Sequence, residues 1–60
     1  MTEVRIKYAP NKSNVGMNLW LTQTCGLRYR KDWFWEHTPN GFVYKFVSES
    51  DAATFALKWS

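Results

Sequence analysis

Residues 42–59 read FVYKFVSESDAATFALKW, an alternating aromatic strand that runs through polar residues into a helix. Alternation of aromatic residues with smaller or charged ones over 42–46 has the period of two typical of a half-buried strand. Ser48 followed three residues later by Asp51 is typical of a helix N-terminus, where side-chain oxygens accept free backbone N–H groups. The pattern therefore predicts a strand, a cap and a helix in direct succession.

The predicted C-terminal helix has one apolar stripe. Ala52, Phe55, Ala56 and Trp59 fall at positions i, i+3, i+4 and i+7, which share one face of a helix. Lys58 lies near the negative end of the helix dipole, where a cation is favourable. We expect the stripe to lie on a sheet.

A turn sequence, TPNG at residues 38–41, precedes the aromatic strand. Proline sets φ for the second turn position and Asn-Gly tolerates the left-handed region, so strands 33–38 and 41–47 should form a hairpin. The register has two alternatives. A two-residue loop would pair Trp35 with Tyr44 and put the odd-numbered residues of the first strand on the aromatic face. A bulge at the glycine would bring its even-numbered residues there instead.

The first half of the chain predicts one strand and one helix. Apolar and charged residues alternate over Thr2–Tyr8, and Pro10 ends that strand. Residues 13–26 fit both periods, but Ser13 is a good N-cap and Gly26 is placed to end a helix, so a helix is favoured.

These elements give the order β-α-β-β-α. We expect an α+β fold: a small two-layer domain, residues 1–60, in which an antiparallel hairpin and the N-terminal strand form a sheet with both helices on one face. A chain of 60 residues is close to the minimum for a stable core. Its aromatic content, 18%, compensates because each ring buries about 150–250 Å².

Composition excludes several function classes. One cysteine, Cys25, cannot form an internal disulfide or, alone, a zinc site, and this usage fits the reducing cytoplasm. His37 is the single histidine, so a multi-histidine metal centre is excluded. No apolar run approaches the ~20 residues of a membrane span, and no secretory leader is evident. We therefore expect a cytoplasmic protein with no membrane partner.

Residues for catalysis are not apparent either. Glu49 and Asp51 are explained by helix capping, Glu36 can pair with Lys45 across the hairpin, and the glycines are isolated rather than gathered in a phosphate loop. Cys25 and His37 are more simply explained as structural residues than as a nucleophile pair. We expect no enzyme activity, no cofactor, no bound metal and no small-molecule substrate.

The function class that remains is binding of another macromolecule. A basic segment interleaved with aromatic rings, together with two outward cations of the first strand, gives one candidate surface: Arg5, Lys7, Arg28, Tyr29, Arg30, Lys31 and Trp33. Cations on phosphates and rings under bases are typical of weak, sequence-tolerant binding of single-stranded nucleic acid. The net charge of +3 is only a mild excess for that function.

A protein partner is the competing interpretation. If the sheet face opposite the helices exposes Phe34, Val43 and Val47, it forms an apolar patch able to seat another chain or a second copy. An exposed strand edge offers main-chain pairing as well.

The aromatic strand at 42–46 and the sequence SDAATFALKW at 50–59 resemble the closing segment of small, mostly uncharacterised proteins of tailed bacteriophages, which end in an Asp-Ala…Phe-x-Leu-x-Trp pattern. Upstream, Trp20, Cys25-Gly26 and the cluster 33–35 lie where such proteins have a helix, a glycine stop and an aromatic strand. The resemblance implies a phage origin and activity in an infected bacterium, where such proteins bind host machinery or serve replication and packaging. It implies no catalytic or binding residue.

The sequence thus predicts a non-enzymatic, phage-type accessory protein that binds another macromolecule, with a host or phage protein preferred. Single-stranded nucleic-acid binding is one alternative, and a small self-assembling structural protein is another.

Overall fold

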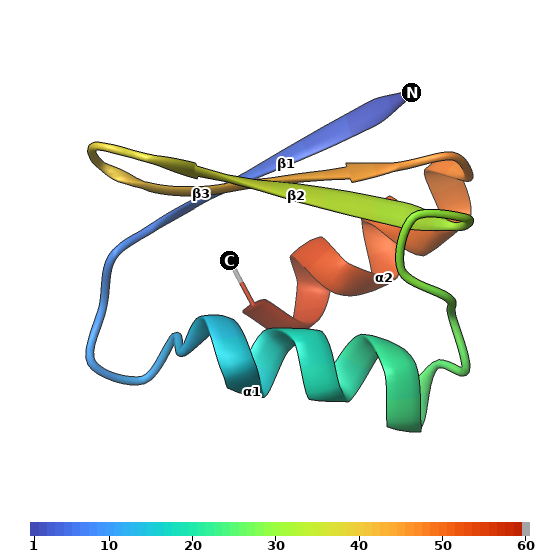
Figure 1. Ribbon diagram of the computed structural model, residues 1–60, viewed down its shortest axis with the longest axis horizontal. Helices are drawn as coiled ribbons and strands as arrows, with labels where there is room; N and C mark the ends of the chain where they lie inside the picture. Colours follow the sequence, from blue (N-terminus) through green and yellow to red (C-terminus); the bar gives the residue numbers. More distant parts are fainter. Residues whose placement is uncertain (60) are drawn as a thin grey trace.

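The computed structural model describes residues 1–59 and has the predicted order of elements. They are β1 (Thr2–Lys7), α1 (Asn14–Leu19), the π-helical segment η1 (Trp20–Thr24), β2 (Trp33–Thr38), β3 (Gly41–Phe46) and α2 (Glu49–Trp59). Both helices lie on one side of a three-stranded antiparallel sheet (Figure 1). The α+β fold, with a hairpin and an N-terminal strand beneath two helices, is confirmed.

The central strand of the sheet is β3, because the order is β1-β3-β2. The hairpin has the two-residue loop: Trp35 pairs with Tyr44, and Thr38 pairs with Gly41. This pairing excludes the register with a bulge at the glycine. Gly41 serves a different purpose: a Cβ on it would lie 2.0 Å from the carbonyl oxygen of Ile6, so β1 can approach the hairpin this closely only beside glycine.

The core fills the space between the sheet and the helices. Aromatic residues of β3 point into it and meet the apolar stripe of α2, whose Ala52 and Phe55 are buried. Met17 and Leu21 enter it from the first helix and Ile6 from β1. The Phe55 ring contacts the rings of its two neighbours on the central strand at centroid distances of 4.7 and 5.2 Å. The predicted stripe is confirmed as a core face.

The caps of both helices form as predicted. Ser13 Oγ accepts a hydrogen bond from Gly16 N–H at 3.1 Å, and Ser48 Oγ accepts one from Asp51 N–H at 3.4 Å. These contacts satisfy backbone donors that have no partner within the first turn. Gly26, at φ +69°, takes the left-handed conformation that ends the first helix.

The first helix changes pitch after Leu19. Cys25 N–H donates to the carbonyl of Trp20, five residues earlier, at 3.2 Å. The hydroxyl of Thr22 donates to the carbonyls of Asn18 and Leu19, at 3.1 and 3.2 Å. This hydroxyl competes with backbone donors for those acceptors, which accounts for the wider π turn.

No helix within residues 1–59 has the length and apolar character needed to cross a bilayer.

Candidate binding surface

The two outer strands leave main-chain groups directed away from the sheet. Val47 N–H donates to the carbonyl of Asp32 at 3.1 Å, and Tyr8 N–H donates to that of Asn40 at 3.1 Å. In antiparallel pairing, hydrogen-bonded positions alternate with positions whose N–H and C=O point the other way. The even-numbered residues of both outer strands therefore bond β3, and the odd-numbered residues face outward.

The two edges differ in side-chain chemistry. The outward residues of β1 are Glu3, Arg5 and Lys7, and charges at such positions discourage pairing with another strand. The outward residues of β2 are Trp33, Trp35 and His37, none of which is a carboxylate, lysine or arginine. The β2 edge is therefore the less protected of the two.

The start of the β2 edge is covered by the chain itself. Arg30 N–H donates to the Trp33 carbonyl at 2.8 Å, and Tyr29 forms a one-residue parallel bridge with Trp33. Arg30 reaches this position in the left-handed region, at φ 68°. The turn is closed by Asp32, whose N–H bonds the Arg28 carbonyl and whose carboxylate accepts the Arg28 N–H, both at 2.8 Å. Beyond this turn, Trp35 and His37 present the outward main-chain groups of the edge.

A groove of about 370 Å³ opens beside this edge, between β2 and the first helix. Its lining residues are Val15, Asn18, Leu19, Thr22, Tyr29, Trp33 and Trp35. Three of them are exposed apolar side chains: Val15 at 66%, Leu19 at 48% and Tyr29 at 45%. Exposed apolar side chains gathered around a groove are typical of interaction sites. We call this feature the α1–β2 groove.

The structure separates the predicted basic surface into two parts. Arg28, Tyr29, Arg30 and Lys31 lie together, exposed, at the Trp33 end of β2. Lys7 lies in the row of Thr38, five rows away, which is about 17 Å along the sheet. Arg5 and Lys7 also belong to the opposite edge strand. The structure therefore does not bring Arg5 and Lys7 together with the other candidate residues.

Trp33 does not serve as an exposed stacking ring, contrary to expectation. Its side chain is 1% exposed and stacks on Tyr44 at a centroid distance of 5.9 Å. Its buried indole N–H has no hydrogen-bond partner within residues 1–59. The residue belongs to the core because its odd-numbered position directs it toward the helices, although it is also among the residues that line the groove.

The apolar patch expected on the other sheet face is also absent among residues 1–59. Val43 is 5% exposed and lies between the charged Arg5 and Glu36 of its neighbouring strands. Val47 is exposed but follows the end of β3, and Phe34 is half-buried. This face instead carries the ion pairs Arg5–Glu3, at 3.4 Å, and Lys45–Glu36, at 3.3 Å. The predicted hairpin ion pair is confirmed.

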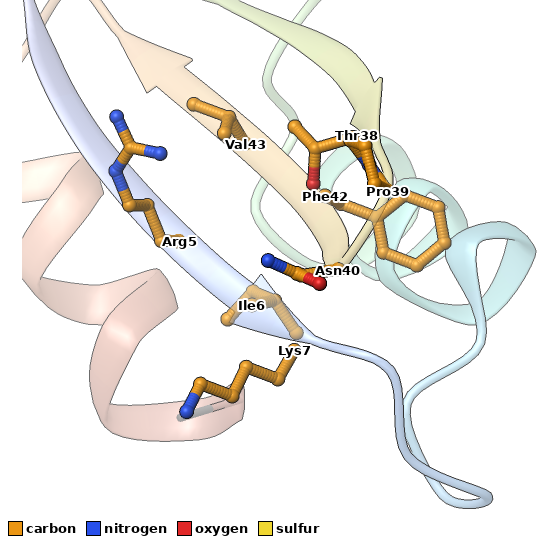
Figure 2. Close-up of a pocket in the computed structure, with 8 residues that line it drawn as sticks. All are labelled: Arg5, Ile6, Lys7, Thr38, Pro39, Asn40, Phe42 and Val43. Atoms are coloured by element: carbon orange, nitrogen blue, oxygen red, sulfur yellow. The ribbon is translucent and has the colours of Figure 1, made fainter.

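A second hollow, of about 350 Å³, lies near the hairpin loop (Figure 2). Arg5 and Lys7 are among its lining residues, but their charged ends extend in different directions, away from Asn40. Two cations that do not converge make a poor anion site. We therefore place the candidate binding surface at the α1–β2 groove and the adjoining β2 edge.

The cysteine and the histidine of the chain each have contacts that explain them as structural residues. Burial, followed by the charge of Asp51, raises the pKa of the Cys25 thiol and so disfavours the reactive thiolate. The Tyr8 hydroxyl lies within hydrogen-bond distance of two acceptor or donor atoms, the Thr38 carbonyl at 3.0 Å and His37 Nε2 at 2.9 Å. Within residues 1–59, no cluster of three or more metal-binding side chains forms.

Comparisons with family models, curated proteins and solved structures gave no match. The candidate surface therefore rests on geometry.

The α1–β2 groove was not predicted from the sequence, although one signal pointed to it. Val15 and Leu19 are spaced four apart and fall outside the helix face that contains Met17 and Leu21, so they had to be exposed on a helix.

Proposed function

We propose that this protein is a non-enzymatic accessory protein that binds another protein through the α1–β2 groove. The observation that carries the proposal is the exposure of Val15, Leu19 and Tyr29 around one groove in so small a chain. Burying these side chains against a partner is favourable by about 25 cal/mol for each Å² of apolar surface removed from water. The resemblance to tailed-phage proteins supports a partner inside an infected bacterium.

Affinity capture with a matched pair of variants tests this function. Leu19→Glu places a charge in the groove, whereas Leu57→Glu makes the same change on α2, where Leu57 is 87% exposed and does not line the groove. A true partner should be retained from bacterial lysate by the wild type and by Leu57→Glu, and lost from Leu19→Glu. Isothermal titration with the purified partner then measures both affinities. Equal retention by the two variants, or no retained protein, would refute the proposal.

A second candidate is weak binding of single-stranded nucleic acid by Arg28, Tyr29, Arg30 and Lys31. It is supported by exposed cations beside an exposed ring, since no carboxylate within residues 1–59 forms an ion pair with these three basic side chains. Tryptophan fluorescence titrated with a short oligonucleotide measures it. Phosphate binding should weaken steeply as salt rises, whereas apolar protein contact should not. No signal change at micromolar protein and low salt excludes this candidate.

A further inference from the structure

We propose that the partner segment binds as an extended antiparallel strand along the β2 edge, with an apolar side chain in the α1–β2 groove and carboxylates near Arg30. This inference rests on the protein-binding function proposed above. It adds the conformation and chemistry of the segment that is bound. Addition of a strand to a sheet edge is an established mode of peptide recognition, in which main-chain bonds supply affinity and side-chain pockets supply specificity.

Four main-chain groups of β2 are available to bond an added strand. The N–H and C=O of Trp35 and of His37 point away from β3, at alternate positions of one edge. The preceding carbonyl, that of Trp33, already accepts a hydrogen bond from Arg30 N–H, which shows that this edge accepts a neighbouring backbone. A short extended segment beyond the turn at Arg30 can therefore make four hydrogen bonds in the same geometry as the sheet.

Side-chain direction links this edge to the groove. Trp35 pairs with Tyr44, which is buried on the helix side of the sheet, so the Trp35 side chain points to that side. A residue placed opposite Trp35 in an added strand shares its face, because side chains of paired residues lie on the same side of a sheet. Its side chain then enters the groove toward Leu19 and Val15. An apolar residue at this position is favoured.

Basic side chains near the β2 edge favour acidic residues in the bound segment. Arg28, Arg30 and Lys31 are exposed, and their side chains form no ion pair with a carboxylate within residues 1–59. They lie at the Trp33 end of β2. An antiparallel strand has its C-terminal end there, so acidic residues C-terminal to the apolar residue meet three cations.

A second copy of the chain fits this edge poorly in each antiparallel register. With Trp35 opposite His37 of the second copy, the two Glu36 side chains face each other directly, and opposed like charges destabilise a pair of strands. With Trp35 opposite Trp35, the straight strand of each copy would run into the backbone at Arg30 of the other copy, whereas the end of a short peptide can turn away from it. With His37 opposite His37, Trp35 would face Pro39, which has no N–H to donate. The edge is therefore suited to a foreign segment.

The test uses the capped peptide Ac-Thr-Leu-Thr-Leu-Thr-Leu-Glu-Glu-NH₂ and ¹⁵N-labelled protein followed by NMR. We expect saturable binding with a Kd of about 100 μM or tighter, and slower hydrogen exchange of the Trp35 and His37 amides in the complex. Leu19→Glu should weaken binding at least about tenfold, whereas Leu57→Glu should leave it unchanged. Replacing both glutamates of the peptide by lysine should weaken binding by a factor that shrinks as salt is added.

Backbone methylation of the peptide isolates the strand geometry. Methylating the alternate amides that face β2 removes donors and should abolish binding, whereas methylating the other alternate set should spare it. No change at the Trp35 and His37 amides with about 1 mM peptide overturns the inference. So does equal binding of both methylated peptides, or a dimer of the free protein in which these amides are already protected. If the lysate partner distinguishes Leu19→Glu from Leu57→Glu in either case, protein binding stands and only the strand addition fails.

Discussion

Tyr44 joins the two layers through both of its chemical parts. Its ring lies between Trp33, Trp35 and Phe55, and its hydroxyl donates to Asn18 Oδ1 at 2.7 Å and accepts from Asn14 Nδ2 at 2.8 Å. Alternation in the sequence grouped this ring with Phe42 and Phe46 on one face of the strand, and the structure shows that this face is the buried one. The asparagine partners could not be predicted, because they lie 26 and 30 residues away and depend on how the first helix is rotated.

The ionisation of Tyr44 gives a prediction at high pH. Burial raises the pKa of Tyr44 from 10.0 to about 12, an effect only partly offset by the hydrogen bond from Asn14. The unfolded chain therefore loses this proton first. The contribution to the free energy of unfolding is intact below about pH 10 and falls by about 2 kcal/mol as the pH rises to about 12. Urea denaturation followed by tryptophan fluorescence measures this decline. Tyr44→Phe has no ionising hydroxyl at this site and should decline less steeply; parallel curves would contradict the assignment.

Arg30 has a backbone conformation that suits glycine better. Its φ of 68° brings Cβ close to the following carbonyl, a strain of about 1–2 kcal/mol for an L-residue. Arg30→Gly should therefore raise the free energy of unfolding, by up to about 1 kcal/mol after the entropy that glycine adds to the unfolded chain. Arg28→Gly, at a position outside the left-handed region, should lower it. Chemical denaturation compares the two variants, and the same sign for both would show that the turn at Arg30 is relaxed.

At the scale of elements, the sequence predicted where each helix and strand lies better than it predicted the hydrogen-bond pattern inside the first helix. Ser13 and Gly26 correctly marked the ends of the first helix, because capping depends on residues close in sequence. The π segment was not predicted. It depends on the rotamer of Thr22 and on a bond between Cys25 and Trp20, which the apolar period does not report.

The helix α2 allows a test of the core stripe. Phe55 is fully buried against the sheet, whereas Leu57, two residues later, is 87% exposed. Phe55→Ala should lower the free energy of unfolding by about 3–5 kcal/mol, because it removes buried surface and leaves a cavity. Leu57→Ala should change it by less than about 0.5 kcal/mol. Thermal unfolding followed by circular dichroism separates the two. A wild-type melting temperature for Phe55→Ala would mean that α2 is packed differently.

At the scale of the whole molecule, the layer arrangement followed from local patterns, but the assembly of the surface did not. Arg5 and Arg30 looked like parts of one basic surface because both are cations near aromatic residues. The order β1-β3-β2 places a strand between them. Val15 and Leu19 were not recognised as a site because an apolar residue in a short chain is first assumed to be core. Strand order and helix rotation are long-range properties, so the site could be predicted only in part.

The protection of the sheet edges gives a prediction about self-association. We expect the wild type to be monomeric, because Glu36 would face itself in the register that makes most use of the β2 edge. Glu36→Thr removes that repulsion and adds a residue favoured in strands, so it should promote a dimer. Glu3→Thr leaves Arg5 and Lys7 on the β1 edge and should remain monomeric. Analytical ultracentrifugation across a range of concentrations decides this. A monomeric Glu36→Thr would mean that another feature blocks the edge.

The hydrogen bonds of Asn14 and Asn18 to one buried hydroxyl have a consequence for how the protein can diversify. The two amides are one turn apart and fix the rotation of α1 about its axis. Val15 and Leu19 each follow one of them by a single residue, so their outward direction is set by polar contacts and not by their own size or hydropathy. Side chains at these two positions can therefore be exchanged without re-seating the helix. A lineage of such proteins could alter which partner it binds while inheriting the same fold.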